Sequence, residues 1–239
     1  MNTYRKNAVM AGVLFALGTV FGILGAVIGG KVLISLMSSK PLAGVDMLSL
    51  VAANTSQLTG GALFTIMMGT SLVAMTVFLY PIFRKDSEEL AMGMVLFRGA
   101  LEGTWYFVTA LGFLALVALG NEYVATAADS AALQSMGSVL YQVQARLAPL
   151  GPSFFLIGAT CLYVSFYRTR LIPRWLSIWG LIAVVFYMAS TLLKFFQVDA
   201  GFGFYLEMVM APQEIVMAVW LIVKGFNRSA IAALFAREE

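Results

Sequence analysis

The chain has 239 residues, of which 61% are hydrophobic and 11% charged, and its formal net charge at pH 7 is +3. Soluble domains carry roughly 25% charged residues, so this composition excludes an ordinary soluble domain and predicts an integral membrane protein. The basic residues lie between long apolar runs, which indicates membrane orientation and not binding to nucleic acid. The sequence contains no histidine. This rules out haem and zinc sites with histidine ligands, and hydrolytic mechanisms that use a histidine base.

Six apolar runs follow one another along the chain. They cover residues 8–30, 61–83, 90–119, 149–167, 175–196 and 203–223. A helix of about 20 residues crosses the roughly 30 Å hydrocarbon core of a bilayer. We therefore expect an all-α, polytopic membrane protein, a six-transmembrane-helix bundle with short outer interfacial helices, forming a single transmembrane domain over residues 1–239.

The first run resembles a signal peptide, but it is long and has no A-x-A-like cleavage site, so it is predicted to be a retained span. Gly18, Gly22, Gly25 and Gly29 fall on one face of this helix. Such a ridge lets a neighbouring helix approach closely, which predicts a packing role. After the first span, residues 41–52 have the pattern of a short helix on the bilayer surface.

The stretch 135–167 is too long for one span and contains two prolines, Pro149 and Pro152. Proline interrupts helices, so an amphipathic lead-in helix is expected to end near Leu147, with the fourth span after it. The preceding loop, residues 121–134, has acidic residues and no base, which is typical of a non-cytoplasmic loop.

The positions of the bases predict the topology. One side carries Arg5, Lys6, Arg84, Lys85, Arg168, Arg170, Arg174, Lys224, Arg228 and Arg237, and the other carries only Lys31, Lys40 and Lys194. The positive-inside rule makes the more basic side cytoplasmic. A multi-pass protein of the cell membrane, with cytoplasmic N and C termini, is expected.

Three ionisable residues lie deep within the spans. Arg98 and Glu102 are one helical turn apart in the third span, so their side chains can meet. Counting from the predicted cytoplasmic ends at about 1.5 Å per residue puts Glu102 and Glu214 roughly 15 to 18 Å deep, in one layer. Two carboxylates and one guanidinium leave an unbalanced negative charge, so either one glutamate is protonated or an ionic partner completes the set.

This layer has two interpretations, which the residues leave open. Arg98 could clamp Glu102 against Glu214 and fix two helices together. Alternatively, the layer together with Gln213 could face a cavity and bind or exchange a ligand or a proton, since intramembrane ionisable residues are commonly functional.

A second polar layer is expected nearer the outside. It comprises Glu207, Arg146 and Lys194, with Gln142 and Gln144 on the lead-in helix. These residues could line a wet vestibule, but for Lys194 and Arg146 we favour simple snorkelling to the interface.

Three stretches carry a family resemblance: FRGALEGTW at 97–105, SFYRTRLIPRWLSIWGLI at 165–182 and PQEIVMAVWLIVKGF at 212–226. Together they resemble the bacterial membrane protein family "domain of unknown function 4386" (DUF4386). The residues that match the family pattern are Arg98, Glu102, Pro173, Arg174, Trp175 and Glu214. The resemblance implies six spans in a bacterial inner membrane and no particular activity.

The expected function is non-enzymatic: binding or transport of a small amphiphile or proton at the Arg98, Glu102 and Glu214 layer. The alternative is an accessory subunit or assembly factor that docks with other membrane subunits. An enzyme would have to rely on carboxylates alone, because no G-x-S-x-G motif is present. No metal and no cofactor are predicted, although a bound lipid, quinone or pigment held by packing alone would leave no sequence signature. The partner expected in every case is the lipid bilayer, and nucleic acid is not expected.

Overall fold

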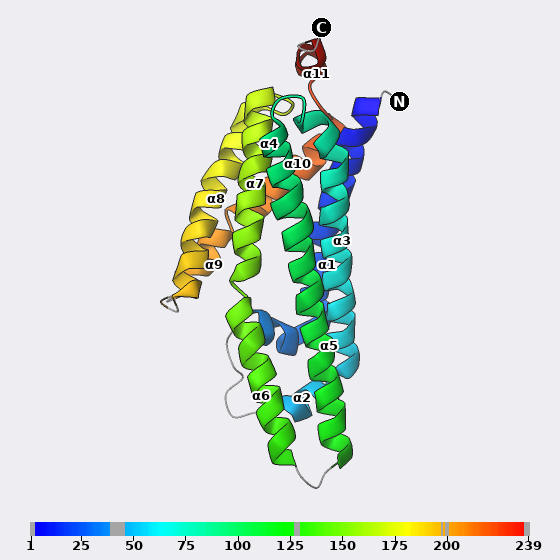
Figure 1. The fold of residues 1–239 in the computed structure, drawn as a ribbon, viewed down its shortest axis with the longest axis vertical. Coiled ribbons are helices and arrows are strands. Elements are labelled where there is room, and N and C mark those ends of the chain that lie inside the picture. The colour runs from blue at the N-terminus through cyan, green and yellow to red at the C-terminus, as the bar shows by residue number, and fades with distance from the viewer. Residues whose placement is uncertain (1–2, 39–45, 127–129, 197, 199–200, 237–239) are drawn as a thin grey trace. The chain divides into compact units, whose positions relative to one another are not determined.

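The computed structural model describes residues 3–38, 46–126, 130–196, 198 and 201–236. These residues form helices and no strand (Figure 1). The helices are α1 (Thr3–Ser38), α2 (Met47–Ala53), α3 (Thr55–Phe83), α4 (Glu88–Met94), the π-helix η1 (Val95–Leu101), α5 (Glu102–Thr126), α6 (Ser130–Leu147), α7 (Leu150–Thr169), α8 (Arg174–Phe195), α9 (Phe202–Glu207), α10 (Met210–Val223) and α11 (Arg228–Phe235). Six helical segments are long and apolar enough to cross a membrane, which confirms the predicted fold class. Lys40 and Arg237, which entered the topology prediction, lie outside the described residues, and so do residues 127–129 of the predicted loop 121–134.

The chain divides into two compact units. Unit 1 comprises Met1–Thr19, Thr70–Gly103 and Gly151–Glu239, and unit 2 comprises Val20–Gly69 and Thr104–Leu150. Along the chain, α1, α3 and the continuous segment from α4 to α5 each pass from one unit to the other. The single domain over residues 1–239 stays a prediction.

Unit 2 has an apolar core to which α2 contributes. The core residues are Val32, Leu33, Val51, Leu58, Ala62, Ala110, Phe113, Leu116 and Val117. The α2 helix buries Leu48 and Val51 almost completely, and Asp46 caps it by accepting a hydrogen bond from the Leu48 backbone N–H at 3.2 Å. This helix is the described part of the short helix predicted over 41–52, whose first residues, up to 45, lie outside the described range.

Three glycines of the predicted ridge, Gly22, Gly25 and Gly29, lie in unit 2 and pack there. A Cβ atom at Gly61 of α3 would lie 3.1 Å from the Cα of Gly29 and 3.3 Å from the carbonyl oxygen of Gly25. A Cβ at Gly22 would meet the sulfur of Met68 at 2.8 Å. The small residues of α1 therefore let the α3 backbone approach closely, as expected for helices packed in a membrane.

The predicted end of the first span coincides with a kink. At Gly30 the backbone takes φ 60° and ψ −155°, and α1 continues beyond it to Ser38. Glycine has no Cβ, so it adopts this positive φ without the strain that other residues would have. The lead-in helix α6 ends at Leu147, as predicted, and α7 begins at Leu150.

In unit 1 the last span is broken into α9 and α10, with Met208 and Val209 between them. Pro212 explains the position of this break. Proline has no N–H to donate to the carbonyl four residues earlier, and its ring clashes with that carbonyl. A continuous helix through Met208 is therefore disfavoured, whereas proline in the first turn of α10 is tolerated.

Candidate functional site

Arg98 lies at the centre of the π-helix η1 and is only 3% exposed. In unit 1 the backbone of α7 passes very close to it, because a Cβ atom at Gly158 would lie 2.5 Å from the Arg98 nitrogen. Gly99 is also closely packed, because a Cβ atom added to it would lie 2.9 Å from Oγ1 of Thr76. Short π-helical segments are rare and occur frequently at functional sites. Neither the π-helix nor the role of Gly158 could be predicted from the local sequence pattern.

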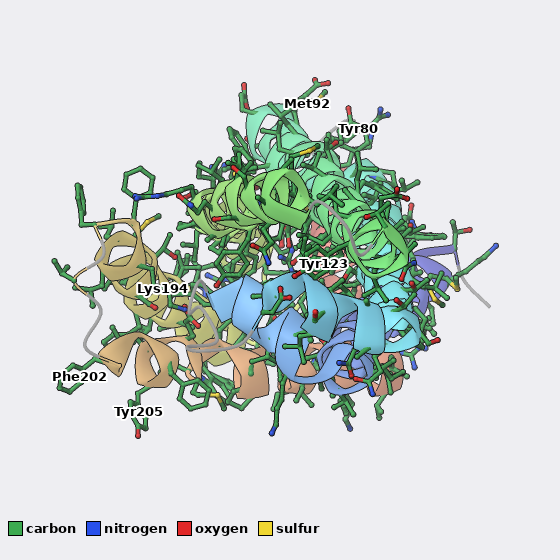
Figure 2. All side chains as sticks on the ribbon, turned by 90° about the horizontal axis from the view of Figure 1, so that it is seen from below. Tyr80, Met92, Tyr123, Lys194, Phe202 and Tyr205 are labelled. Carbon is green, nitrogen blue, oxygen red and sulfur yellow. The ribbon has the colours of Figure 1, made fainter. Side chains whose placement is uncertain are left out.

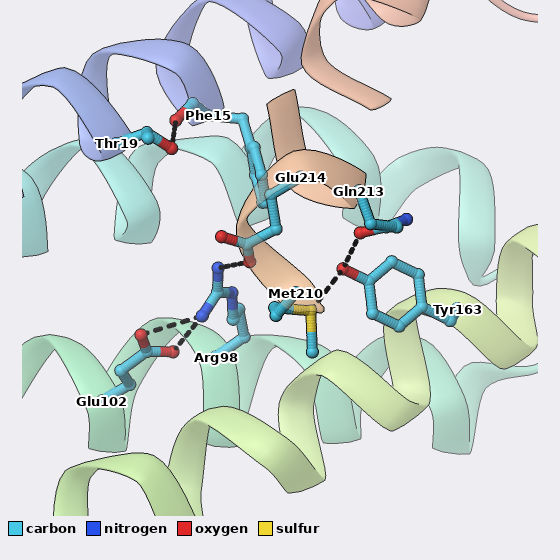
Figure 3. A network of polar contacts seen from close by, with 8 residues as sticks. All are labelled: Phe15, Thr19, Arg98, Glu102, Tyr163, Met210, Gln213 and Glu214. Carbon is cyan, nitrogen blue, oxygen red and sulfur yellow. Dashed lines mark hydrogen bonds and ion pairs between the residues drawn. The ribbon is translucent and has the colours of Figure 1, made fainter. Parts of the chain in front are cut away.

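The guanidinium of Arg98 joins two carboxylates (Figure 3). Its Nη1 donates to both oxygens of Glu102, each at 2.9 Å, and its Nη2 donates to Oε1 of Glu214 at 3.3 Å. The side chain of Glu102 is 1% exposed and that of Glu214 is 18% exposed. The predicted contacts of Arg98 are thus present, and they are unequal: Glu102 is held tightly and Glu214 loosely.

Two aromatic rings flank the guanidinium. Its central carbon lies 4.4 Å from the ring centroid of Phe155 and 5.5 Å from that of Phe15. Cation–π contacts of this kind are worth about 0.5 to 2 kcal/mol, more when the cation is desolvated. Both rings are buried, so they hold the cation away from lipid. Nothing in the sequence distinguished these two of its 18 phenylalanines.

Gln213 is next to Glu214 in sequence but serves another set of contacts. The Tyr163 hydroxyl donates to Oε1 of Gln213 at 2.7 Å, and Nε2 of Gln213 donates to the Leu176 carbonyl at 3.1 Å. Tyr163 and Gln213 are fully buried, and Figure 3 shows this pair beside the ion-paired cluster. The amide of Gln213 thus links α10 to α7 and α8, which positions the turn that carries Glu214.

The predicted outer layer is divided between the two units. In unit 1, Lys194 Nζ and Ser190 Oγ both donate to the same oxygen of Glu207, the serine at 2.7 Å. In unit 2, Arg146 is exposed, and buried Gln144 donates to the Thr109 carbonyl at 3.2 Å.

Gln142, also in unit 2, donates to Ser138 Oγ at 3.3 Å. The structure therefore brings Lys194 and Glu207 together and adds Ser190, which no sequence pattern indicated. Snorkelling of Lys194 and Arg146 stays a prediction.

Within the described ranges, no group of three or more His, Cys, Asp or Glu side chains is placed to hold a metal ion. The candidate site is the ion-paired set of Arg98, Glu102 and Glu214, which we call the inner cluster.

Six membrane-spanning helical segments and a buried arginine–glutamate cluster define a polytopic helical membrane protein that contacts lipid. Residues 10–225 match the model of the family described as "Domain of unknown function (DUF4386)", and the chain belongs to this family. The comparison with curated proteins found no match, and neither did the comparison with solved structures.

Proposed function

We propose that this protein is a non-enzymatic binding or transport-like protein whose inner cluster takes up a cation, either a proton or the cationic head of a small amphiphile. The observation that carries the proposal is the formal charge of the cluster. Arg98 supplies one positive charge, Glu102 and Glu214 supply two negative charges, and all three lie in membrane-spanning segments. An uncompensated charge in a low-dielectric interior is strongly unfavourable, so the cluster requires a further positive charge.

Glu214 is the better candidate for exchange. Glu102 is nearly inaccessible and uses both oxygens on Arg98, whereas Glu214 makes one longer contact and keeps 18% of its side chain exposed. A cation can therefore reach Glu214 without displacing the Glu102 pair. In this proposal Arg98 and Glu102 hold the geometry, and Glu214 binds the proton or cationic head.

The test uses the full chain in lipid nanodiscs. An alkyl trimethylammonium probe is titrated by calorimetry, and the infrared carboxyl band is followed with pH. The Glu214→Gln variant is expected to bind the probe at least tenfold more weakly and to lack the titrating band. Glu122→Gln, which changes an exposed carboxylate at the outer end of α5, serves as the matched control and is expected to match wild type.

A purely structural clamp gives a different result. If Glu214→Gln lowers the stability of the protein but leaves both the titrating band and probe binding at wild-type level, the binding proposal fails. Full retention of the fold is checked by circular dichroism for each variant.

An accessory-subunit role is the second candidate, and one observation favours it. The end of α8 and the α9 segment expose a group of aromatic side chains, and Phe202 and Tyr205 point away from α9 (Figure 2). They are Phe195, Phe196, Phe202, Phe204 and Tyr205, each at least 54% exposed. Such a surface suits either the membrane interface or a neighbouring subunit. Purification from native membranes tests this role, and a chain that always runs alone argues against it.

For orientation, we propose the inner membrane of a bacterial cell with both termini cytoplasmic. The distribution of bases between the spans supports this assignment. Fusions of a cytoplasm-active and a periplasm-active reporter to each terminus test it, and activity of the periplasmic reporter at either end would overturn it.

A further inference from the structure

In unit 1, α8 and the short helix α9 pack against each other, and one ion pair joins them. Lys194 Nζ and Ser190 Oγ both donate to Oε1 of Glu207. Lys194 is the next-to-last residue of α8, and Glu207 is the last residue of α9. Because α8 is long and apolar enough to cross a membrane, the pair lies at the end of a span, where the hydrocarbon of a bilayer gives way to lipid head groups.

This ion pair is accessible and has unused hydrogen-bonding capacity. The side chain of Lys194 is 42% exposed and that of Glu207 is 21% exposed. An ammonium group has three N–H donors and a carboxylate has two oxygens. The contacts among the described residues use one donor of Lys194 and only Oε1 of Glu207. Donors and an acceptor of opposite charge therefore lie side by side and are open to a ligand.

Exposed aromatic side chains flank the pair. Two of them directly follow Lys194 in sequence and three belong to α9, of which Phe202 and Tyr205 point away from the helix (Figure 2). Aromatic rings of this kind are enriched at the level of the head groups. The core of a protein–protein interface, in contrast, is depleted of lysine and glutamate. An exposed Lys194–Glu207 pair among these rings therefore favours a lipid head group over a neighbouring subunit at this surface.

We propose that Lys194 and Glu207 bind the head group of a zwitterionic phospholipid that carries a primary ammonium, such as phosphatidylethanolamine. The phosphate of the lipid accepts hydrogen bonds from the Lys194 ammonium. The ammonium of the lipid donates to Oε2 of Glu207, and the aromatic side chains pack against the adjoining part of the acyl chains. This site uses none of the residues of the inner cluster, so it does not depend on the proposed function.

The charges of the pair determine which lipid is expected. Anionic lipids are attracted by clusters of several lysines and arginines, whereas Lys194 and Glu207 together carry no net charge. The trimethylammonium group of phosphatidylcholine has no N–H to donate to Oε2 of Glu207. Phosphatidylethanolamine supplies both an anionic acceptor for Lys194 and an N–H donor for Glu207. Ser190 fixes Oε1 of Glu207 at 2.7 Å, which orients the carboxylate.

The experiment counts retained lipids by native mass spectrometry. The full chain in detergent is incubated with equal amounts of phosphatidylethanolamine, phosphatidylglycerol and phosphatidylcholine that carry the same acyl chains. Wild type is expected to retain phosphatidylethanolamine preferentially. Lys194→Gln and Glu207→Gln each remove a charge-assisted hydrogen bond and are expected to weaken this retention about tenfold. Lys31→Gln and Glu122→Gln, which change exposed residues outside α8 and α9, are the matched controls and are expected to behave as wild type.

Several outcomes would overturn the site. Unchanged retention in both Lys194→Gln and Glu207→Gln means that the pair only joins α8 to α9. Equal or better retention of phosphatidylglycerol or phosphatidylcholine by wild type contradicts the assigned head group, and this comparison decides even if a variant fails to fold. Glycerophosphoethanolamine, the head group without acyl chains, is not expected to displace the lipid at equal concentration, and displacement would overturn the assignment to a lipid. A protein that co-purifies and is joined to Lys194 by an amine-reactive cross-linker would overturn it in favour of a subunit.

Discussion

Replacing Arg98 by glutamine is the sharpest test of how unit 1 is held together. The variant leaves the carboxylates of Glu102 and Glu214 facing each other without the guanidinium between them. Breaking a buried ion pair by removing one partner costs about 3 to 5 kcal/mol. Loss of the contacts with Phe155 and Phe15 adds about 0.5 to 2 kcal/mol.

The size of this effect distinguishes an ionic cluster from ordinary polar contacts. Neutral hydrogen bonds between membrane helices contribute on average about 0.6 kcal/mol. We therefore expect Arg98→Gln to lower the free energy of unfolding by about 3 kcal/mol or more, measured by steric trapping in bicelles. Arg228→Gln is the matched control, because Arg228 is exposed at the start of α11, and a change within about 0.5 kcal/mol is expected for it.

A double variant tests the physical cause. The double variant Arg98→Gln/Glu102→Gln removes one buried carboxylate together with its ion-pair partner. It is therefore expected to be more stable than Arg98→Gln alone, although less stable than wild type. The reasoning is refuted if Arg98→Gln changes the unfolding free energy by less than about 1 kcal/mol, the size of an ordinary hydrogen bond.

Three further predictions concern packing and capping. Gly158→Ala is expected to lower stability by about 1 to 3 kcal/mol, since its Cβ would overlap the Arg98 backbone; unchanged stability by steric trapping would contradict this contact. Gly61→Val is expected to separate α1 from α3 in unit 2, and a cysteine cross-link between these helices that forms as in wild type would argue against it. The Tyr123 hydroxyl, followed by the Ser49 and Leu48 hydrogen bonds, lowers the pKa of Asp46 below its usual 3.8. The capping contribution of Asp46 is therefore full above the pKa of the unfolded chain and is lost as pH falls through the lowered value. Asp46→Asn, which still caps but does not titrate, is expected to remove this acid sensitivity in a thermal unfolding series.

Much of the inner cluster could be predicted because it depends on local spacing and depth. Arg98 and Glu102 are four residues apart, and their side chains meet even though a π-helix replaces the α-helix over Val95–Leu101. Glu214 was located by counting residues from the end of its span. Both arguments use only helix geometry and the thickness of the bilayer.

The residues that pack around the inner cluster in the folded protein could not be predicted from the sequence. The close approach of Gly158 to Arg98 and the stacking of Phe155 depend on how α7 packs in unit 1. Glycine and phenylalanine are common throughout this chain, so no local pattern marks the particular ones that matter. The π-helix could not be predicted either, because such short segments are rare and η1 interrupts an otherwise continuous apolar helix without a sequence pattern of its own.

The break before α10 bears directly on the excess charge of the inner cluster. Because α10 begins at Met210, Glu214 lies one turn from a helix N-terminus, where the positive end of the dipole favours a carboxylate. That effect is worth about 0.3 to 1 kcal/mol and falls off within the first turn. An unpartnered buried charge costs several times more, about 3 to 5 kcal/mol when an ion pair is broken. The helix end therefore reduces the imbalance without removing it, which agrees with the proposal that Glu214 takes up a proton or a cationic group.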